Sequence, residues 1–155
     1  MTIVAWRDGV LASDTMMATG YGVKTGYRPK IYAKGHNAVG FSGDVAALSA
    51  ILRWIEAADE GAIPQAGGSG YSALVFLGAD RRLILLEDGG MQELDPSKPR
   101  AIGAACELAY GALFHGATAV DAAKICAEYH KDCGGSVRSA SFDLASSSWV
   151  FSDHS

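Results

Sequence analysis

The second residue of the chain combines a hydroxyl side chain with a position directly after the initiator methionine. A threonine hydroxyl is a weak nucleophile at its free pKa and needs a neighbouring base. Removal of Met1 would create that base, because an α-amine has a reference pKa of about 7.7 to 8.0 and is partly neutral at cytoplasmic pH. Threonine is small, so we expect methionine aminopeptidase to process this end without a propeptide. Thr2 is therefore a candidate nucleophile; the simpler alternative is an ordinary first residue of a strand.

Three residues near the end of the chain offer a second kind of chemistry. Cys126, His130 and Cys133 have the residue types of zinc ligands, but they lack a fourth ligand and a close cysteine pair. Packing at the end of a helix is the simpler interpretation. With Cys106, the cysteines are odd in number and scattered, which is typical of reduced thiols rather than of a disulfide framework. We predict no metal and no cofactor.

Composition limits the class of protein. With 155 residues, 49% hydrophobic and 19% charged, the chain suits one compact domain over residues 1–155, which would bury roughly 70% of its unfolded surface. The net charge of −4 provides no basic face for nucleic acid or anionic lipid. No apolar run approaches the ~20 residues of a membrane helix, and the first residues lack the layout of a signal peptide. We expect no nucleic-acid or membrane partner and a cytoplasmic location.

Two hairpins are predicted in the first 41 residues. Residues 3–15 carry apolar runs on both sides of Asp8-Gly9, a dipeptide that favours hairpin turns. Residues 31–41 form the second hairpin, with its turn at 35–37. Between them, residues 20–29 hold three glycines and a proline, which predicts an irregular loop.

Three helices are predicted after these hairpins. The first has Asp44 as its N-cap and an apolar face at the i, i+3, i+4, i+7 spacing. That face consists of Leu48, Ile51, Leu52 and Ile55. The other two lie between residues 101 and 135 and are separated by Gly116, a C-cap glycine. Thr118 and Asp121 resemble a capping box at the start of the last helix. Its shared face consists of Ala122, Ile125, Cys126 and Tyr129.

The remaining segments predict further strands. Residues 71–88 contain two runs too apolar for a solvated face, which should be central strands. The Gly/Ala-rich residues 61–70 are expected to be an exposed loop, and residues 136–151 a closing hairpin. Antiparallel pairs interrupted by helices favour an α+β fold, because short hairpins cannot supply the crossovers of a parallel sheet. Two sheets between helix layers would bury every apolar face.

Several short motifs occur in an order that resembles the N-terminal-nucleophile hydrolases of the proteasome β-subunit and bacterial HslV type. These are Thr2, "DGVLASDT" with Asp14, "RPKIY" with Lys30, "GFSGD" with Gly43, and the "AIG" before the paired helices. The resemblance covers nearly the whole chain, and the small size is most similar to short HslV-like proteins of bacteria and prophages. It implies a four-layer αββα sandwich of two antiparallel sheets flanked by helices.

Two intervals bear on this resemblance. Asp14 and Lys30 are 16 residues apart, as are the family's catalytic aspartate and lysine. Thr2 and Asp14 are 12 apart, four fewer than in the family. An even loss shortens both arms of the hairpin equally and keeps Thr2 across from the Asp14 region. A rival alignment with Met1 as the nucleophile requires an odd shift, which would turn the side chain to the other face.

The resemblance also implies roles for these residues. Lys30 would lower the pKa of the Thr2 hydroxyl and amine, and Asp14 would hold Lys30 in position. The N–H of Gly43 would be an oxyanion donor that contributes ~3 kcal/mol to transition-state stabilisation. The pocket for the residue before the scissile bond would be apolar and lined by Met17, Phe41 and Val45.

Three positions depart from the family pattern. Ala104 stands where a serine commonly follows "AIG", and His130 and Cys133 stand where an aspartate and a serine precede the Gly-Gly pair. His130 can still form a hydrogen bond through water, and Cys133 is a weaker donor than serine, so both remain candidates for a support network. An ordinary helix-terminal role for His130 is the simpler alternative.

The function implied is a threonine peptidase that cleaves peptides or unfolded proteins through an acyl-enzyme on Thr2. Family members stack into rings of six or seven subunits, usually fed by a ring ATPase, and the resemblance implies the same self-association here. Two alternatives remain open at this point. One is a catalytically inactive ring or scaffold protein, and the other is an amidase that acts on small amides.

Overall fold

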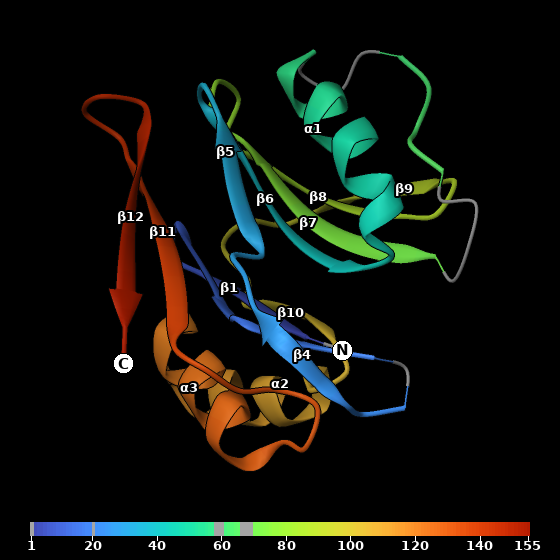
Figure 1. Cartoon of the computed structure of the whole chain (residues 1–155). Helices are drawn as coiled ribbons and strands as arrows, with labels where there is room; N and C mark the ends of the chain where they lie inside the picture. The colour runs from blue at the N-terminus through green and yellow to red at the C-terminus, as the bar shows by residue number, and fades with distance from the viewer. Residues whose placement is uncertain (1, 20, 58–60, 66–69) are drawn as a thin grey trace.

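Two five-stranded antiparallel sheets stack face to face between layers of helix (Figure 1). The computed structural model describes residues 2–19, 21–57, 61–65 and 70–155. The first sheet has the order β10 (Arg100–Gly103), β1 (Ile3–Arg7), β2 (Val10–Asp14), β11 (Val137–Asp143) and β12 (Ser148–His154). The second has the order β5 (Ile31–Lys34), β6 (Asn37–Gly43), β7 (Tyr71–Leu77), β8 (Arg82–Glu87) and β9 (Gly90–Leu94). A small pair, β3 (Met16–Ala18) and β4 (Lys24–Tyr27), extends from the first sheet as an arm.

Helices cover the outer face of each sheet. α2 (Cys106–Phe114) and α3 (Ala119–Tyr129) pack on the first sheet, and α1 (Leu48–Glu56) packs on the second. The α+β sandwich predicted from the sequence is therefore confirmed. Among the described residues, no helix has the length and apolar character that a membrane crossing requires.

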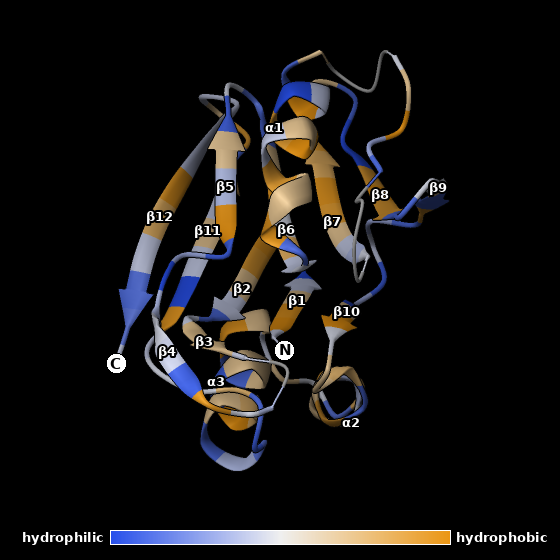
Figure 2. Cartoon of the chain, turned by 45° about the vertical axis from the view of Figure 1, so that its right-hand side comes forward, coloured by the Kyte–Doolittle hydropathy of each residue, from blue (hydrophilic) through white to orange (hydrophobic). Residues whose placement is uncertain are grey.

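The alternation of side chains along β1 separates two of the three apolar layers. Ile3 and Ala5 face α2 and α3, whereas Val4 and Trp6 face the second sheet. Trp6 stacks there on Phe76 of β7 with ring centroids 5.0 Å apart. The third layer lies between α1 and the outer face of the second sheet. β7, the middle strand, is predominantly hydrophobic (Figure 2), as expected for a strand covered on both faces.

Most local predictions are confirmed. The first hairpin turns at Asp8 and Gly9, whose φ values of 51° and 78° fit the turn that matches the twist of two strands. The second hairpin and the closing hairpin form as β5–β6 and β11–β12. Gly116 has a φ of 95° between α2 and α3, and the Thr118 hydroxyl accepts from the Asp121 N–H at 3.0 Å.

Four details differ from the prediction. Asp44 caps a short 3₁₀ turn (Val45–Ala47) rather than α1 itself, because its carboxylate accepts from the Ala46 N–H. Tyr129 is not part of the buried face of α3: it is the last residue of that helix and is 73% exposed. Residues 24–27 form β4 instead of a loop, because β3 supplies pairing partners across a bulge. Within the loop predicted at 61–70, residues 66–69 lie outside the described residues, and Pro64 is buried, accepting a hydrogen bond from the Tyr71 hydroxyl.

Substitution of Gly103 tests how closely β10 approaches the start of β1, and substitution of Gly111 is the comparison. Gly103 has a φ of 106°, and a Cβ there would lie 2.1 Å from the carbonyl oxygen of Thr2. Gly103→Ala should therefore destabilise the protein by about 3 kcal/mol. Gly111→Ala, in the open middle of α2, should stabilise it by up to about 1 kcal/mol. Urea unfolding followed by circular dichroism measures both, and equal small effects would contradict the close approach.

Candidate active site

A buried carboxylate at the end of β2 is the centre of the site. Asp14 is fully buried, and both of its oxygens accept hydrogen bonds. Oδ1 accepts from the Lys30 ammonium at 2.7 Å and from the Ile3 N–H at 3.3 Å. Oδ2 accepts from the Gly134 N–H at 3.1 Å. These three donors come from three separate parts of the chain, so Asp14 connects the second sheet and the loop after α3 to the start of β1.

Lys30, which directly precedes β5, is the cation of this pair and is only 7% exposed. Burial lowers the pKa of Lys30 below its ordinary value, because a charged ammonium loses solvation. The charge and hydrogen bond of Asp14 oppose this effect and favour the ammonium. The protonation of Lys30 therefore depends directly on Asp14.

The loop after α3 closes over Asp14. The carbonyl of Gly134 accepts from the N–H groups of Thr15 and Met16, and the Thr15 hydroxyl donates to the carbonyl of Ser136 at 2.8 Å. These contacts fix the N–H of Gly134 where it donates to the carboxylate. The loop thus positions Asp14.

Thr2 lies at the start of β1, one residue away from direct opposition to Asp14. The β1–β2 register pairs Val4 with Ser13, and its continuation places Thr2 opposite Thr15. Thr2 shares the face of Val4, which points toward the second sheet. Thr2 is buried, with only 3% of its surface exposed.

Gly43, at the end of β6, faces Thr2 from the second sheet. The Asp44 N–H donates to the Gly70 carbonyl next to β7. Because successive N–H groups of a strand point to opposite sides, the Gly43 N–H points away from β7, past the beginning of β5. Gly43 has a φ of 127°, and a Cβ would lie 2.6 Å from the Gly70 carbonyl oxygen. Only glycine fits here.

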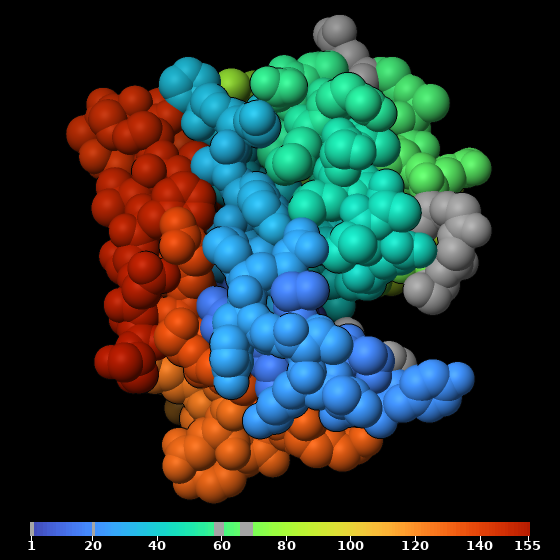
Figure 3. All heavy atoms as spheres, in the orientation of Figure 1, coloured from blue at the N-terminus to red at the C-terminus, as the bar shows by residue number. Residues whose placement is uncertain are grey.

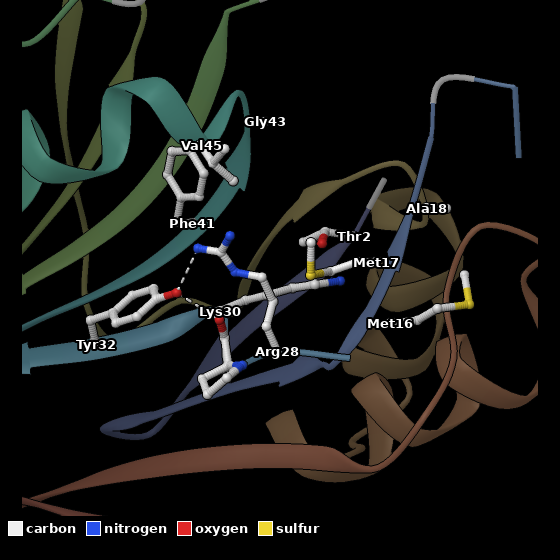
Figure 4. A pocket seen from close by; sticks show the side chains of 11 residues that line it. Thr2, Met16, Met17, Ala18, Arg28, Lys30, Tyr32, Phe41, Gly43 and Val45 are labelled. Carbon is white, nitrogen blue, oxygen red and sulfur yellow. Dashed lines mark hydrogen bonds between the residues drawn. The ribbon is translucent and has the colours of Figure 1, made fainter. Parts of the chain in front are cut away.

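One cavity of about 110 Å³ brings these residues together. Its wall includes Thr2, Lys30 and Gly43 together with the three predicted pocket residues Met17, Phe41 and Val45. Figure 3 shows the surface hollowed between the β3–β4 arm and the beginning of α1. In the close view the Lys30 side chain extends toward Thr2, while Phe41 and Val45 lie on the opposite wall (Figure 4).

The cavity also contains residues that were not predicted. Met16, Ala18, Arg28, Pro29 and Tyr32 complete its wall. A guanidinium nitrogen of Arg28 donates to the Tyr32 hydroxyl at 3.1 Å, and that hydroxyl donates to the Pro29 carbonyl at 2.7 Å. Arg28 and Tyr32 lie two residues before and after Lys30 in "RPKIY". That alternation in an extended segment is the signal that identifies them.

The proposed support residues lie outside this cavity wall. Cys133 is buried against the α2–α3 side, and burial together with the nearby Asp14 charge raises its pKa to about 12. It therefore remains a thiol at neutral pH. His130 follows α3, and its Nδ1 accepts from the Asp132 N–H at 3.2 Å within a local turn. Ala104 is exposed beside Gly103. Among the described residues, no group of three His, Cys, Asp or Glu side chains could hold a metal ion.

Comparison with known proteins identifies solved structures with a similar fold. No protein-family model and no curated protein matches the chain. A solved structure of Thiobacillus denitrificans BPH in complex with epoxomicin is similar, with a TM-score of 0.61 and 21% identity over 90% of this chain and 96% of that chain. A Gly-1 mutant of Anbu from Hyphomicrobium sp. strain MC1 has a TM-score of 0.67 and 12% identity, over 100% of this chain and 88% of that chain. The chain therefore has the αββα fold of proteasome-like N-terminal-nucleophile hydrolases.

Proposed function

We propose that this protein is a threonine peptidase of the N-terminal-nucleophile type. The observation that carries the proposal is the buried Lys30–Asp14 ion pair, of which Lys30 lines the same cavity as Thr2 and Gly43. A buried charge pair beside a hydroxyl and a backbone N–H is the arrangement that nucleophilic catalysis requires. Removal of Met1 would complete it by freeing the α-amine of Thr2.

The proposed reaction begins at the Thr2 hydroxyl. Its oxygen attacks the carbonyl carbon of the scissile amide, and its proton passes to the α-amine of the same residue. Lys30 stabilises the developing negative charge on the threonine oxygen, and the Gly43 N–H stabilises the oxyanion. Collapse breaks the carbon–nitrogen bond, and the α-ammonium returns the proton to the leaving amine. Water then hydrolyses the acyl ester and regenerates Thr2.

The cavity wall suggests the preferred substrate. Met17, Phe41 and Val45 present apolar surface beside Thr2, so an apolar side chain before the scissile bond should bind best. Peptides or unfolded segments can present such a residue. BPH was solved with epoxomicin, and we propose that the same peptide epoxyketone reacts here with the paired hydroxyl and amine.

A catalytically inactive scaffold is the second candidate function. Ala104 cannot donate the hydrogen bond that a serine would offer there, and Cys133 is a buried thiol with a raised pKa. Both features weaken support for proton transfer at Thr2. The adduct experiment below separates this candidate from the peptidase.

Intact mass spectrometry after treatment with epoxomicin tests the nucleophile. We expect the mass of a chain without Met1 and one covalent adduct per subunit. Thr2→Ala should abolish the adduct, and Thr2→Ser should retain it. Lys30→Ala should slow adduct formation about 100-fold or more, whereas Lys34→Ala, on the exposed end of β5, should not. Retained Met1 without an adduct would leave only the scaffold.

The pH profile tests the role of Asp14. Because the Asp14 charge and hydrogen bond raise the pKa of Lys30, Asp14→Asn should lower that pKa further. The catalytic ammonium would then lose its proton at lower pH, and the alkaline limb of the kcat/KM profile should therefore move to lower pH. Asp8→Asn, in the exposed hairpin turn, is the matched control. The thermal melting of each variant confirms folding, and an unmoved alkaline limb in a folded Asp14→Asn variant would contradict the role.

Self-association into stacked rings of six or seven subunits, with a possible ring ATPase as partner, is the proposed assembly. Large apolar side chains are exposed on several surfaces, among them Tyr21, Tyr27 and Phe114. Such side chains are typical of surfaces that contact other subunits. Native mass spectrometry should give six or seven copies, or twice that number. A monomer that hydrolyses small amides would instead indicate the amidase.

A further inference from the structure

A second cavity, of about 580 Å³, adjoins the site on the other side of Gly43. Gly43 belongs to the walls of both cavities. The second wall also includes Gly103, which lies against the carbonyl of Thr2. The two cavities therefore share Gly43, the proposed oxyanion donor, and the second cavity has Gly103 in its wall, which lies beside the backbone of Thr2.

The floor of this second cavity is a polar row on the inner face of the second sheet. Ser42 of β6 pairs directly with Ser72 of β7, and Ser72 pairs directly with Glu87 of β8. The preceding row on the same face is Gly40, Leu74 and Leu85, and Leu74 there belongs to the core between the sheets. The face thus changes from apolar to polar at the point where the cavity opens.

The two cavities differ in charge. Arg28 and Lys30 line the one that holds Met17 and Phe41, whereas Glu87 and Asp88 line the second. A cationic group in the second cavity would be attracted by two carboxylates and could donate hydrogen bonds to the serine hydroxyls.

The geometry of acyl transfer assigns the second cavity to the leaving side. The scissile carbonyl carbon is bonded to the acyl residue on one side and to the leaving nitrogen on the other. With its oxygen at the Gly43 N–H and the acyl side chain against Phe41, the leaving nitrogen points away from the first cavity. The second cavity is the adjoining space on the other side of Gly43, and its wall contains Gly103.

We propose that the Ser42–Ser72–Glu87 row, with Asp88, binds the residue that follows the scissile bond and selects a basic side chain there. This inference rests on the proposed peptidase function and adds a specificity to it. The substrate class is a peptide with an apolar residue followed by lysine or arginine.

Internally quenched peptides that differ only in the residue after an apolar residue test the proposal. Arginine there should give a kcat/KM about fivefold above alanine at low salt, with glutamate below alanine. The preference should shrink at high salt. Glu87→Gln should bring the arginine-to-alanine ratio to about twofold or less, and Glu56→Gln, at the exposed end of α1, should leave it unchanged.

A fluorogenic amide with no residue after its scissile bond separates this inference from the proposed function. Glu87→Gln should hydrolyse that amide as fast as the unsubstituted protein. If peptides are cleaved without preference for arginine, or with a preference that Glu87→Gln does not reduce, the basic specificity is overturned and the peptidase stands. If neither substrate is hydrolysed and epoxomicin forms no adduct, both the basic specificity and the proposed peptidase function are overturned.

Discussion

The site depends on one buried ion pair. Moving the Lys30 ammonium and the Asp14 carboxylate out of water is costly, and their attraction offsets that cost only with good geometry and satisfied hydrogen bonds. The 2.7 Å contact and the two backbone donors to Asp14 meet this requirement. The pair therefore needs β1, the segment before β5 and the loop after α3 in their observed places. Any rearrangement of those three segments would leave a buried charge without its partners.

The sandwich explains why these segments meet. β1 and β2 belong to the first sheet, whereas Lys30 precedes β5 and Gly43 ends β6 in the second sheet. The sheets pack through the aromatic and aliphatic layer around Trp6 and Phe76, which sets the distance between them. At the end of this layer, Thr2 and Gly43 replace large side chains, and a cavity opens. The hydrophobic core thus determines how closely the nucleophile and the oxyanion donor approach.

Burial shifts the pKa values of Lys30 and Cys133 in opposite directions. Burial lowers the pKa of Lys30, and the charge and hydrogen bond of Asp14 oppose that shift. Cys133 is surrounded by apolar side chains and lies near the Asp14 charge, and both effects hold its proton on sulfur. Of these two groups, Lys30 lines the Thr2 cavity, whereas Cys133 lies outside its wall.

Local signals in the sequence were sufficient for most elements. Asp8-Gly9, Gly116 and Thr118 act through contacts with residues next to them, so they could be recognised without the fold. The interval between Thr2 and Asp14 likewise gave the prediction that Thr2 lies across from the Asp14 region, because side chains alternate with a period of two. Pairing between distant segments was decided only by the tertiary structure: β4 is a strand because β3 lies beside it, and Pro64 is buried because Tyr71 reaches it. The second cavity belongs to this group as well, since Ser42, Ser72 and Glu87 form a row only when three strands take one register.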